Sequence, residues 1–159
     1  MDPILEILEK DSHLSSEEIG KMLNKKPAEI DAAIEKYKKE GVILRFKAVL
    51  NKELVHKDCV RALIEVQVTP QRGVGFDAIA QRIYHFPEVK SCYLLSGGYD
   101  LLVFVEGENL HKVASFVSEK LSTIDNVRGT VTHFMLKTYK DDGDILQKGE
   151  NDQRIAVSP

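Results

Sequence analysis

The fold of this chain is decided by residues 91–106, which read SCYLLSGGYDLLVFVE. Two apolar runs containing β-branched and aromatic residues flank a Ser-Gly-Gly turn signal, and neither run contains proline. This pattern is typical of a strand, a tight reversal and an antiparallel strand. We therefore predict a hairpin at the centre of one domain.

The turn of this hairpin has two interpretations. Ser96, Gly97 and Gly98 have small side chains that leave their backbone N–H groups uncovered. Tyr99 then adds an amphipathic ring and Asp100 a carboxylate, so the turn offers groups that can hold a small zwitterion. Alternatively, the glycines supply positive φ and Asp100 accepts from turn amides, which requires no ligand. The residues alone leave both interpretations open.

The sequence around the hairpin supplies further strands and helices in a fixed order. Alternating apolar and polar residues predict strands, and apolar residues at helical spacing predict helices. The order is strand, helix, strand, strand, helix, strand, which predicts a ferredoxin-like (βαββαβ) domain with both helices on one face of an antiparallel sheet. The open face must be covered, so a homodimer is expected. The predicted ranges are 60–68, 76–86, 89–95, 100–106, 109–121 and 127–137.

The first fifty residues predict three short helices. Asp2-Pro3 is an N-cap and first-turn signal for a helix that ends near Lys10. Ser15 and Glu18 have the spacing of a capping box, and the inward face of that second helix would be Ile19, Met22 and Leu23. After the turn at 24–26, Pro27 opens a third helix and Gly41 ends it.

The β-prone run at 42–50 completes the pattern of a winged helix-turn-helix, with this run as the wing or exit strand. The alternative is a small helical bundle for protein contacts. Outward positions of the third helix carry Glu29, Asp31 and Glu35, which repel phosphates. Residues 1–50 hold nine Lys/Arg and ten Asp/Glu, a balance of −1, so any DNA binding must come from a local patch.

The predicted fold class is thus α+β, with a winged helix-turn-helix followed by a ferredoxin-like domain. We place the helix-turn-helix at 1–50 and a polar linker without periodicity at 51–58. The ferredoxin-like domain spans 59–140 and a C-terminal tail spans 141–159.

Composition excludes several classes of protein. The 159 residues are 43% hydrophobic and 30% charged with a net charge of −3, which is ordinary for a globular protein. No apolar run is long enough to span a bilayer and the start lacks a secretory pattern, so we expect a cytoplasmic protein without membrane contact. Cys59 and Cys92 lack CxxC spacing, and the five histidines lack metal-motif spacing. We expect no metal, no cofactor and no catalytic activity.

Several motifs together resemble the Lrp/AsnC (feast/famine) family of bacterial and archaeal transcriptional regulators. The first two helices resemble those of the family, and Glu40-Gly41-Val42-Ile43 with Ala48-Val49-Leu50 resembles its junction after the third helix. Residues 97–102, GGYDLL, are similar to its effector-loop motif, and Thr130-x-Thr132 to its Thr-x-Thr. The likeness covers roughly residues 4 to 140.

The resemblance implies a sequence-specific DNA-binding regulator whose C-terminal domain binds an amino acid or related small molecule and drives assembly. Homodimers would join into larger rings, often octamers, with double-stranded DNA as the partner of the N-terminal domain. The effector would sit between dimers, and this implication favours the ligand-binding interpretation of the hairpin turn. The implied effector residues are Ser96, Gly97, Gly98, Tyr99, Asp100, Thr130 and Thr132.

The third helix departs from the family pattern. Members typically carry Ser-Pro-Ser at its start and several arginines within it, whereas this chain has Lys26-Pro27-Ala28 followed by acidic residues. The Glu29 carboxylate can accept a hydrogen bond from the amino group of a cytosine base in DNA. One alternative function is an amino-acid sensor that does not bind DNA. Another is an enzyme, because some haem-pathway decarboxylases share this two-domain plan. The expected DNA-contacting residues are Lys25, Lys26, Glu29, Ala32, Lys36, Arg45 and Lys47.

Overall fold

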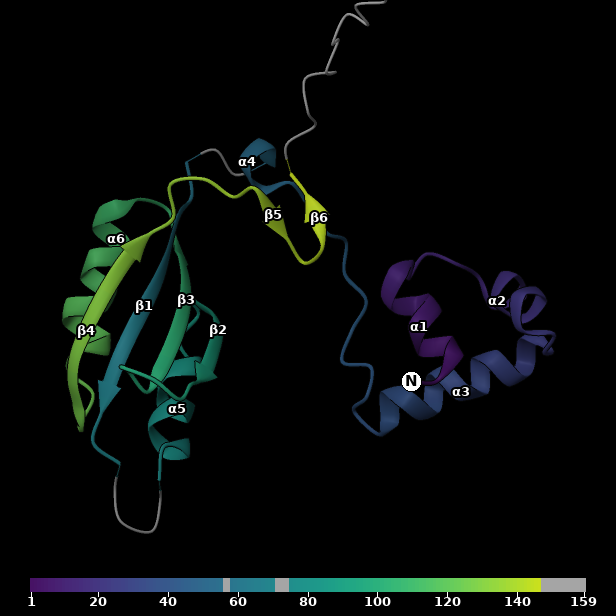
Figure 1. The fold of residues 1–159 in the computed structure, drawn as a ribbon, viewed down its shortest axis with the longest axis horizontal. Helices are drawn as coiled ribbons and strands as arrows, with labels where there is room; N and C mark the ends of the chain where they lie inside the picture. The colour runs from purple at the N-terminus through teal and green to yellow at the C-terminus, as the bar shows by residue number, and fades with distance from the viewer. Residues whose placement is uncertain (56–57, 71–74, 147–159) are drawn as a thin grey trace, which may run out of the picture. The chain divides into compact units, whose positions relative to one another are not determined.

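The computed structural model describes residues 1–55, 58–70 and 75–146. The chain divides into two compact units, Met1–Leu50 and a second that begins at Asn51. Figure 1 shows the helices of the first unit and the sheet of the second. Each unit has its own buried apolar cluster.

The first unit, which we call the head, contains the three predicted helices: α1 (Pro3–Lys10), α2 (Ser16–Leu23) and α3 (Pro27–Lys39). The side chain of Asp2 accepts a hydrogen bond from the Ile4 N–H at 2.8 Å and so caps α1. The Ser15–Glu18 capping box of α2 is confirmed in both directions. Local sequence signals therefore decide where these helices begin.

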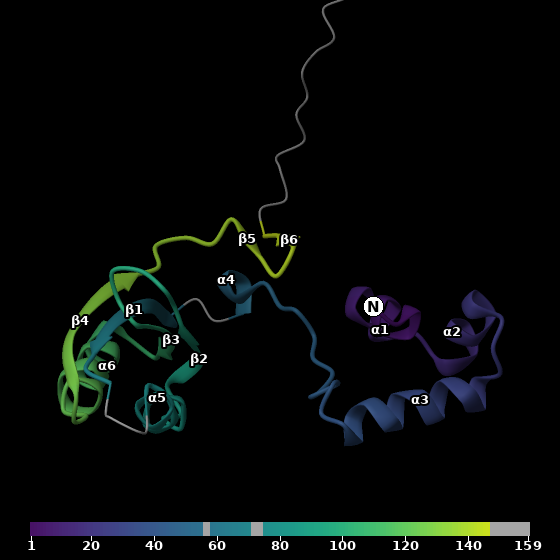
Figure 2. The same cartoon turned by 60° about the horizontal axis from the view of Figure 1, so that its bottom comes forward.

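The core of the head is a small apolar cluster of Ile4, Leu8, Ile19 and Ile30. Figures 1 and 2 show α1 and α2 lying along the same side of α3, which is why only one stripe of each helix is buried. The prediction that Met22 faces inward is wrong, since its side chain is 61% exposed. The buried stripe of α2 runs through Ile19 and the partly buried Leu23.

The β-prone run after α3 forms no strand, so the predicted wing is wrong for the described chain. Residues 43–50 have no regular secondary structure, and Leu44 is 89% exposed. A strand needs a neighbouring strand to receive its hydrogen bonds, and the described head contains no second β-prone run beside this one. High β propensity alone is therefore not enough to form a strand at residues 43–50.

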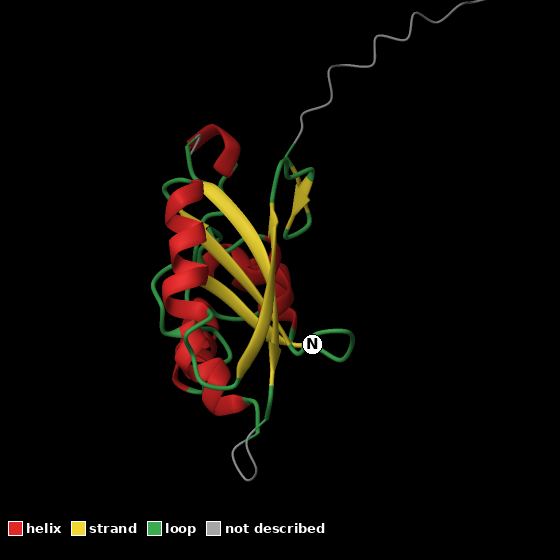
Figure 3. Cartoon of the chain, turned by 90° about the vertical axis from the view of Figure 1, so that its left-hand side faces the viewer, coloured by secondary structure: helices red, strands yellow, loops and turns green. Residues whose placement is uncertain are grey.

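The second unit contains a four-stranded antiparallel sheet in the order β2-β3-β1-β4. One face is covered by α5 (Asp77–Tyr84) and by α6 (Leu110–Ser115), which continues as the π-helical turn η1 (Phe116–Leu121) (Figure 3). The ferredoxin-like order and the α+β class are confirmed, although the last strand ends three residues earlier than predicted. The strands are β1 (Val60–Val68), β2 (Val89–Leu94), β3 (Leu101–Gly107) and β4 (Val127–Phe134).

Strand β1 is the centre of this sheet because it pairs with β3 on one side and β4 on the other. Its alternate residues Ala62, Ile64, Val66 and Val68 are buried against the helices. Burying one such aliphatic side chain contributes roughly 1.5–3 kcal/mol before the entropy cost of ordering it. The intervening residues point to the opposite face, which no helix of the described unit covers and which we call the open face.

The predicted linker and tail both contain regular structure. Residues Lys52–Val55 form one helical turn, α4, and the Asn51 side-chain amide donates to the Leu146 carbonyl at 3.2 Å. The tail begins with a small hairpin of β5 (Lys140–Asp141) and β6 (Asp144–Ile145). Neither had a periodic sequence signal, because these elements are too short to show one. Residues 56–57 of the linker and 147–159 of the tail lie outside the described residues.

Gly20 makes the tight passage from α2 to α3 possible. A Cβ atom at this position would lie 2.7 Å from the Lys25 carbonyl oxygen, which belongs to the backbone and cannot move aside cheaply. The Lys25 N–H in turn donates to the Gly20 carbonyl at 2.9 Å, so the two segments are held in contact.

We predict that Gly20→Ala destabilises the head by about 1–3 kcal/mol, because the clash forces α2 and α3 apart. Hydrogen exchange of the amides in α1, α2 and α3 measures the effect. Gly97→Ala is the matched control, since its Cβ would meet nothing within 4 Å. Unchanged protection of the head in Gly20→Ala would contradict the prediction.

Candidate nucleic-acid interface and effector loop

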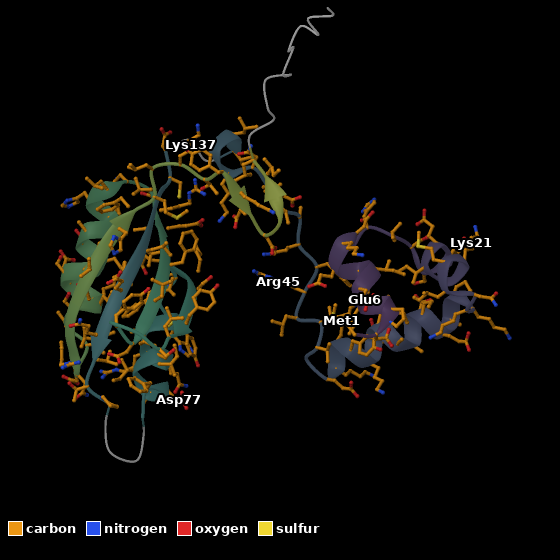
Figure 4. The ribbon with its side chains drawn as sticks, viewed as in Figure 1. Met1, Glu6, Lys21, Arg45, Asp77 and Lys137 are labelled. Carbon is orange, nitrogen blue, oxygen red and sulfur yellow. The ribbon has the colours of Figure 1, made fainter. Side chains whose placement is uncertain are left out.

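The turn between α2 and α3 gathers positive charge. Lys21, Lys25 and Lys26, together with Glu17 and Glu29, line a hollow of about 610 Å³ at this turn. Figure 4 shows Lys21 on α2, with its side chain directed away from the helix. Asn24, which ends α2, adopts a left-handed conformation with φ of 52°, and this turns the chain sharply into α3. The amino end of α3 therefore carries exposed ammonium groups suited to phosphates.

The acidic residues of α3 are engaged by neighbouring groups within the head. Asp31 accepts a hydrogen bond from the Ser16 hydroxyl of α2, and Glu29 accepts from the backbone N–H of Lys26 at 2.8 Å. Glu35 lies 2.9 Å from the Lys38 ammonium, and this hydrogen bond holds the pKa of Glu35 below its usual value. Glu29 thus supplies the N3 half of a capping box by accepting from the N-cap N–H, while the serine-type cap on the N3 N–H is absent.

The remaining residues expected to contact DNA are spread along the head. Ala32 and Lys36 are exposed on α3, and the Lys36 ammonium lies 3.9 Å from Glu40. Arg45 and Lys47 lie on the irregular segment after α3, as Figure 4 shows for Arg45. Because α3 has 13 residues, its two ends are roughly 20 Å apart. The structure therefore brings Lys25, Lys26 and Glu29 together and leaves Arg45 and Lys47 separate from them.

The turn of the β2–β3 hairpin, residues 95–100, is fastened to the end of β1; we call it the effector loop. The Asp100 carboxylate accepts from the Val68 N–H at 2.8 Å, and the Asp100 N–H donates to the Val66 carbonyl at 3.1 Å. Within the loop, the Leu95 N–H donates to the Asp100 carbonyl at 2.9 Å. One carboxylate oxygen of Asp100 is therefore already committed to the backbone.

The two glycines of the effector loop are not needed for its own conformation. Neither Gly97 nor Gly98 has a φ in the left-handed region, and a Cβ on either would meet nothing within 4 Å. The alternative in which these glycines supply positive φ is therefore wrong. Among the residues that the structure describes, none accepts a hydrogen bond from the backbone N–H groups of residues 96–99. These exposed donors can receive a carboxylate.

Thr130 and Thr132 lie near the loop in the sheet but face the other way. Thr130 pairs with Val66 and Thr132 with Ile64 across the β1–β4 ladder. Directly paired residues share a face, so both threonine side chains are on the helix-covered side of the sheet. The structure thus brings the loop and Thr130 to the same end of β1, with the threonine hydroxyls on the opposite face from Gln67.

Gln67 is a candidate site residue that our sequence reasoning missed. Its side-chain N–H donates to the Gly98 carbonyl at 3.4 Å, and its Oε1 lies 3.7 Å from where a Cβ on Gly129 would stand. The β1–β4 register shifts beyond this pair, so that Arg128 is an extra residue in β4. Alternation along β1 places Gln67 on the open face. Only the assembled sheet shows that its side chain reaches the effector loop on one side and β4 on the other.

The described residues contain no cluster of three or more His, Cys, Asp or Glu side chains able to hold a metal ion. Cys59 and Cys92 are free thiols, and burial raises the pKa of Cys92. No helix within the described ranges has the length and apolar character needed to cross a membrane.

The chain is similar to known regulators over nearly its whole length. Residues 61–145 match the family described as the Lrp/AsnC ligand binding domain. YugG, an uncharacterized HTH-type transcriptional regulator of Bacillus subtilis strain 168, is 48% identical over 98% of this chain and 95% of its own. The HTH-type transcriptional regulator LysM of Saccharolobus solfataricus is 35% identical over 86% of this chain and 91% of its own.

A solved structure has the same fold. The transcriptional regulator NMB0573 of Neisseria meningitidis, in complex with L-Met, has a TM-score of 0.70 with 23% identity, covering 87% of this chain and 89% of its own.

The helical head and the ligand-binding sheet domain define a DNA-binding transcriptional regulator of the helix-turn-helix type, and not an enzyme. This chain belongs to the Lrp/AsnC family.

We predict that Asp100→Ala loosens the effector loop, because the Val68 N–H loses its acceptor; the expected loss of stability is about 1–3 kcal/mol. Asp100→Asn keeps a side-chain oxygen at the same place and is expected to retain most of that stability. Chemical denaturation monitored by circular dichroism measures both. Equal destabilisation by the two substitutions would show that the hydrogen bond is not what holds the loop.

We predict that replacing Lys25 and Lys26 by alanine weakens DNA binding at every sequence, because each ammonium that neutralises a phosphate releases counterions. The slope of log K against log salt should fall by about 2 in magnitude. Fluorescence anisotropy with the protein's own upstream DNA, at several salt concentrations, gives this slope. Lys90→Ala with Lys112→Ala in the sheet domain is the charge-matched control, and an equal change there would contradict the assignment.

Proposed function

We propose that this regulator binds an amino acid at the effector loop and that binding alters how a homodimer presents its heads to DNA. The observation that carries the proposal is the run of unpaired backbone N–H groups at residues 96–99, held open on a fastened loop. A carboxylate is the natural ligand for such donors, and the uncommitted oxygen of Asp100 suits an ammonium. The Neisseria meningitidis relative in complex with L-Met supports this ligand class.

The open face of the sheet supports assembly into dimers. The side chains there include Leu63, Phe104 and the exposed Tyr93 and Val131. These apolar side chains, which share the face with the Glu65–His133 pair, are unfavourable in water, and a second copy of the chain supplies a matching surface. In a dimer the heads come in pairs, so the operator is a pseudo-palindrome with half-sites about one helical turn, or a multiple of it, apart. Further dimers build a larger ring such as an octamer.

The linker provides a route from the sheet to the head. Lys52 of α4 pairs with Glu106 of β3, and its ammonium lies 5.8 Å from the centre of the Phe104 ring. Both partners are on the open face, where the second subunit would pack. Because α4 follows the head by one residue, a change in packing over Phe104 reaches the segment that carries the head. This contact supports an effector-dependent change in DNA binding.

We propose for the DNA interface the amino end of α3, with Lys25, Lys26 and Glu29 at its centre. Ala32 and Lys36 extend this surface along α3, and Arg45 and Lys47 hold the DNA backbone from the segment that follows. Among the carboxylates of α3, Glu35 is paired with the Lys38 ammonium, which offsets its repulsion of phosphates, while Glu29 and Asp31 are hydrogen-bonded within the head. This supports DNA binding by the head even though its formal net charge is negative.

We predict that at least one of the twenty amino acids raises the melting temperature of the protein, since a ligand at 100 times its Kd adds about 2.7 kcal/mol to the folded state. Gly98→Ala should melt like the unmodified protein without ligand, because its Cβ stands in open space, yet lose the response, because that space is where the effector binds. Differential scanning fluorimetry measures both. No response to any amino acid, or a full response in Gly98→Ala, would refute the proposed site.

A further inference from the structure

The side chain of Gln67 spans the effector loop and strand β4 on the open face. Its amide N–H donates to the Gly98 carbonyl at 3.4 Å, which orients the amide and directs Oε1 toward β4. Gly129, directly opposite in the ladder, has no side chain, and an ideal Cβ there would lie 3.7 Å from Oε1. Among the described residues, none donates to this oxygen. Gln67 therefore presents an acceptor that the chain itself does not use.

The neighbouring acceptor is only partly available. Asp100 uses Oδ2 to hold the Val68 N–H, the residue next to Gln67. An ammonium group carries three N–H donors and needs more than one acceptor to replace its water. Asp100 Oδ2 already accepts from the backbone, and Gln67 Oε1 offers a further acceptor at the same end of β1.

We propose that Gln67 determines the specificity of the effector site by accepting a hydrogen bond from the effector's ammonium through Oε1. This inference rests on the proposed function, since it concerns the same site. The loop N–H groups of residues 96–99 hold the carboxylate, while Asp100 and Gln67 hold the ammonium. The effector loop thus contacts both ends of the zwitterion, and Gln67 of β1 contacts only the ammonium, so a carboxylic acid that lacks the ammonium leaves Gln67 unused. Thr130 and Thr132 pair with Val66 and Ile64, so their side chains lie on the other face of the sheet.

The test compares two ligands on three proteins. The ligands are the amino acid that most stabilises the unmodified protein and its desamino analogue, the same carboxylic acid with hydrogen in place of the ammonium. The proteins are the unmodified chain, Gln67→Met, which keeps the length of the side chain but removes the amide, and Gln81→Met. Gln81 is an exposed glutamine on α5, which lies on the opposite face of the sheet from Gln67, and serves as the matched control. Isothermal titration calorimetry gives each Kd.

The preference for the amino acid, expressed as the Kd of the analogue divided by that of the amino acid, should fall about tenfold or more in Gln67→Met. The substitution removes the acceptor of a hydrogen bond from the ammonium, and only the amino acid has that ammonium, so only its Kd should rise. Gln81→Met should leave the preference unchanged. Gln67→Glu retains an oxygen near the ammonium and adds charge, so it should restore the preference.

Each other outcome is decisive. If both Kd values rise equally in Gln67→Met, then Gln67 only positions the loop and the inference is overturned, while the proposed effector site stands. If neither Kd changes, Gln67 does not contribute and the inference also fails. If no amino acid binds the unmodified protein, the proposed function fails first. Melting temperatures without ligand show whether each variant is folded, and Gln67→Glu provides the second variant if Gln67→Met is not.

Discussion

Everything in the second unit depends on the pairing of β1 along both of its edges. A strand hydrogen-bonded on two sides has one face against the helices and one open face, and a shift by one residue would exchange them. The zero exposure of Ala62, Ile64 and Val66 makes such a shift very costly. The same register places Gln67 on the open face and brings the Val68 N–H to the carboxylate of Asp100. The apolar core and the effector loop are therefore consequences of one alignment.

The structure of the head depends on close backbone packing at the α2–α3 turn and on hydrogen bonds and ion pairs that its charged side chains make locally. Gly20 lets the α2–α3 turn close, which exposes Lys25 and Lys26 at the amino end of α3. The carboxylates that made this helix look unsuitable for DNA are used in caps and pairs within the head. Glu29 is the clearest case, since its carboxylate accepts from the Lys26 N–H as the N3 glutamate of a capping box does. Net charge was a poor guide to this helix because Glu29, Asp31 and Glu35 each have a specific neighbour.

The sequence predicted most elements of the fold because their signals are local. Asp2, Ser15 with Glu18, and Pro27 mark helix starts that the structure confirms. Alternation identified β1, and the Ser-Gly-Gly signal identified the β2–β3 turn. The failures share a cause. The run at 42–50 has strand propensity without a partner, and α4 and the β5–β6 hairpin exist through contacts such as that of Asn51 with Leu146. Propensity cannot reveal whether a partner is within reach.

For the candidate site, the sequence by itself determined which residues make up the effector loop, that it joins two strands, and that Asp100 follows it directly. Only the tertiary structure decided what those residues contact. It showed that Asp100 is bonded to the neighbouring strand, that the glycines need no left-handed conformation, and that Gln67 spans two strands while Thr130 and Thr132 face the helices. The physical reason is that element type follows from short-range chemistry, whereas the surroundings of a side chain are set by residues distant in the chain.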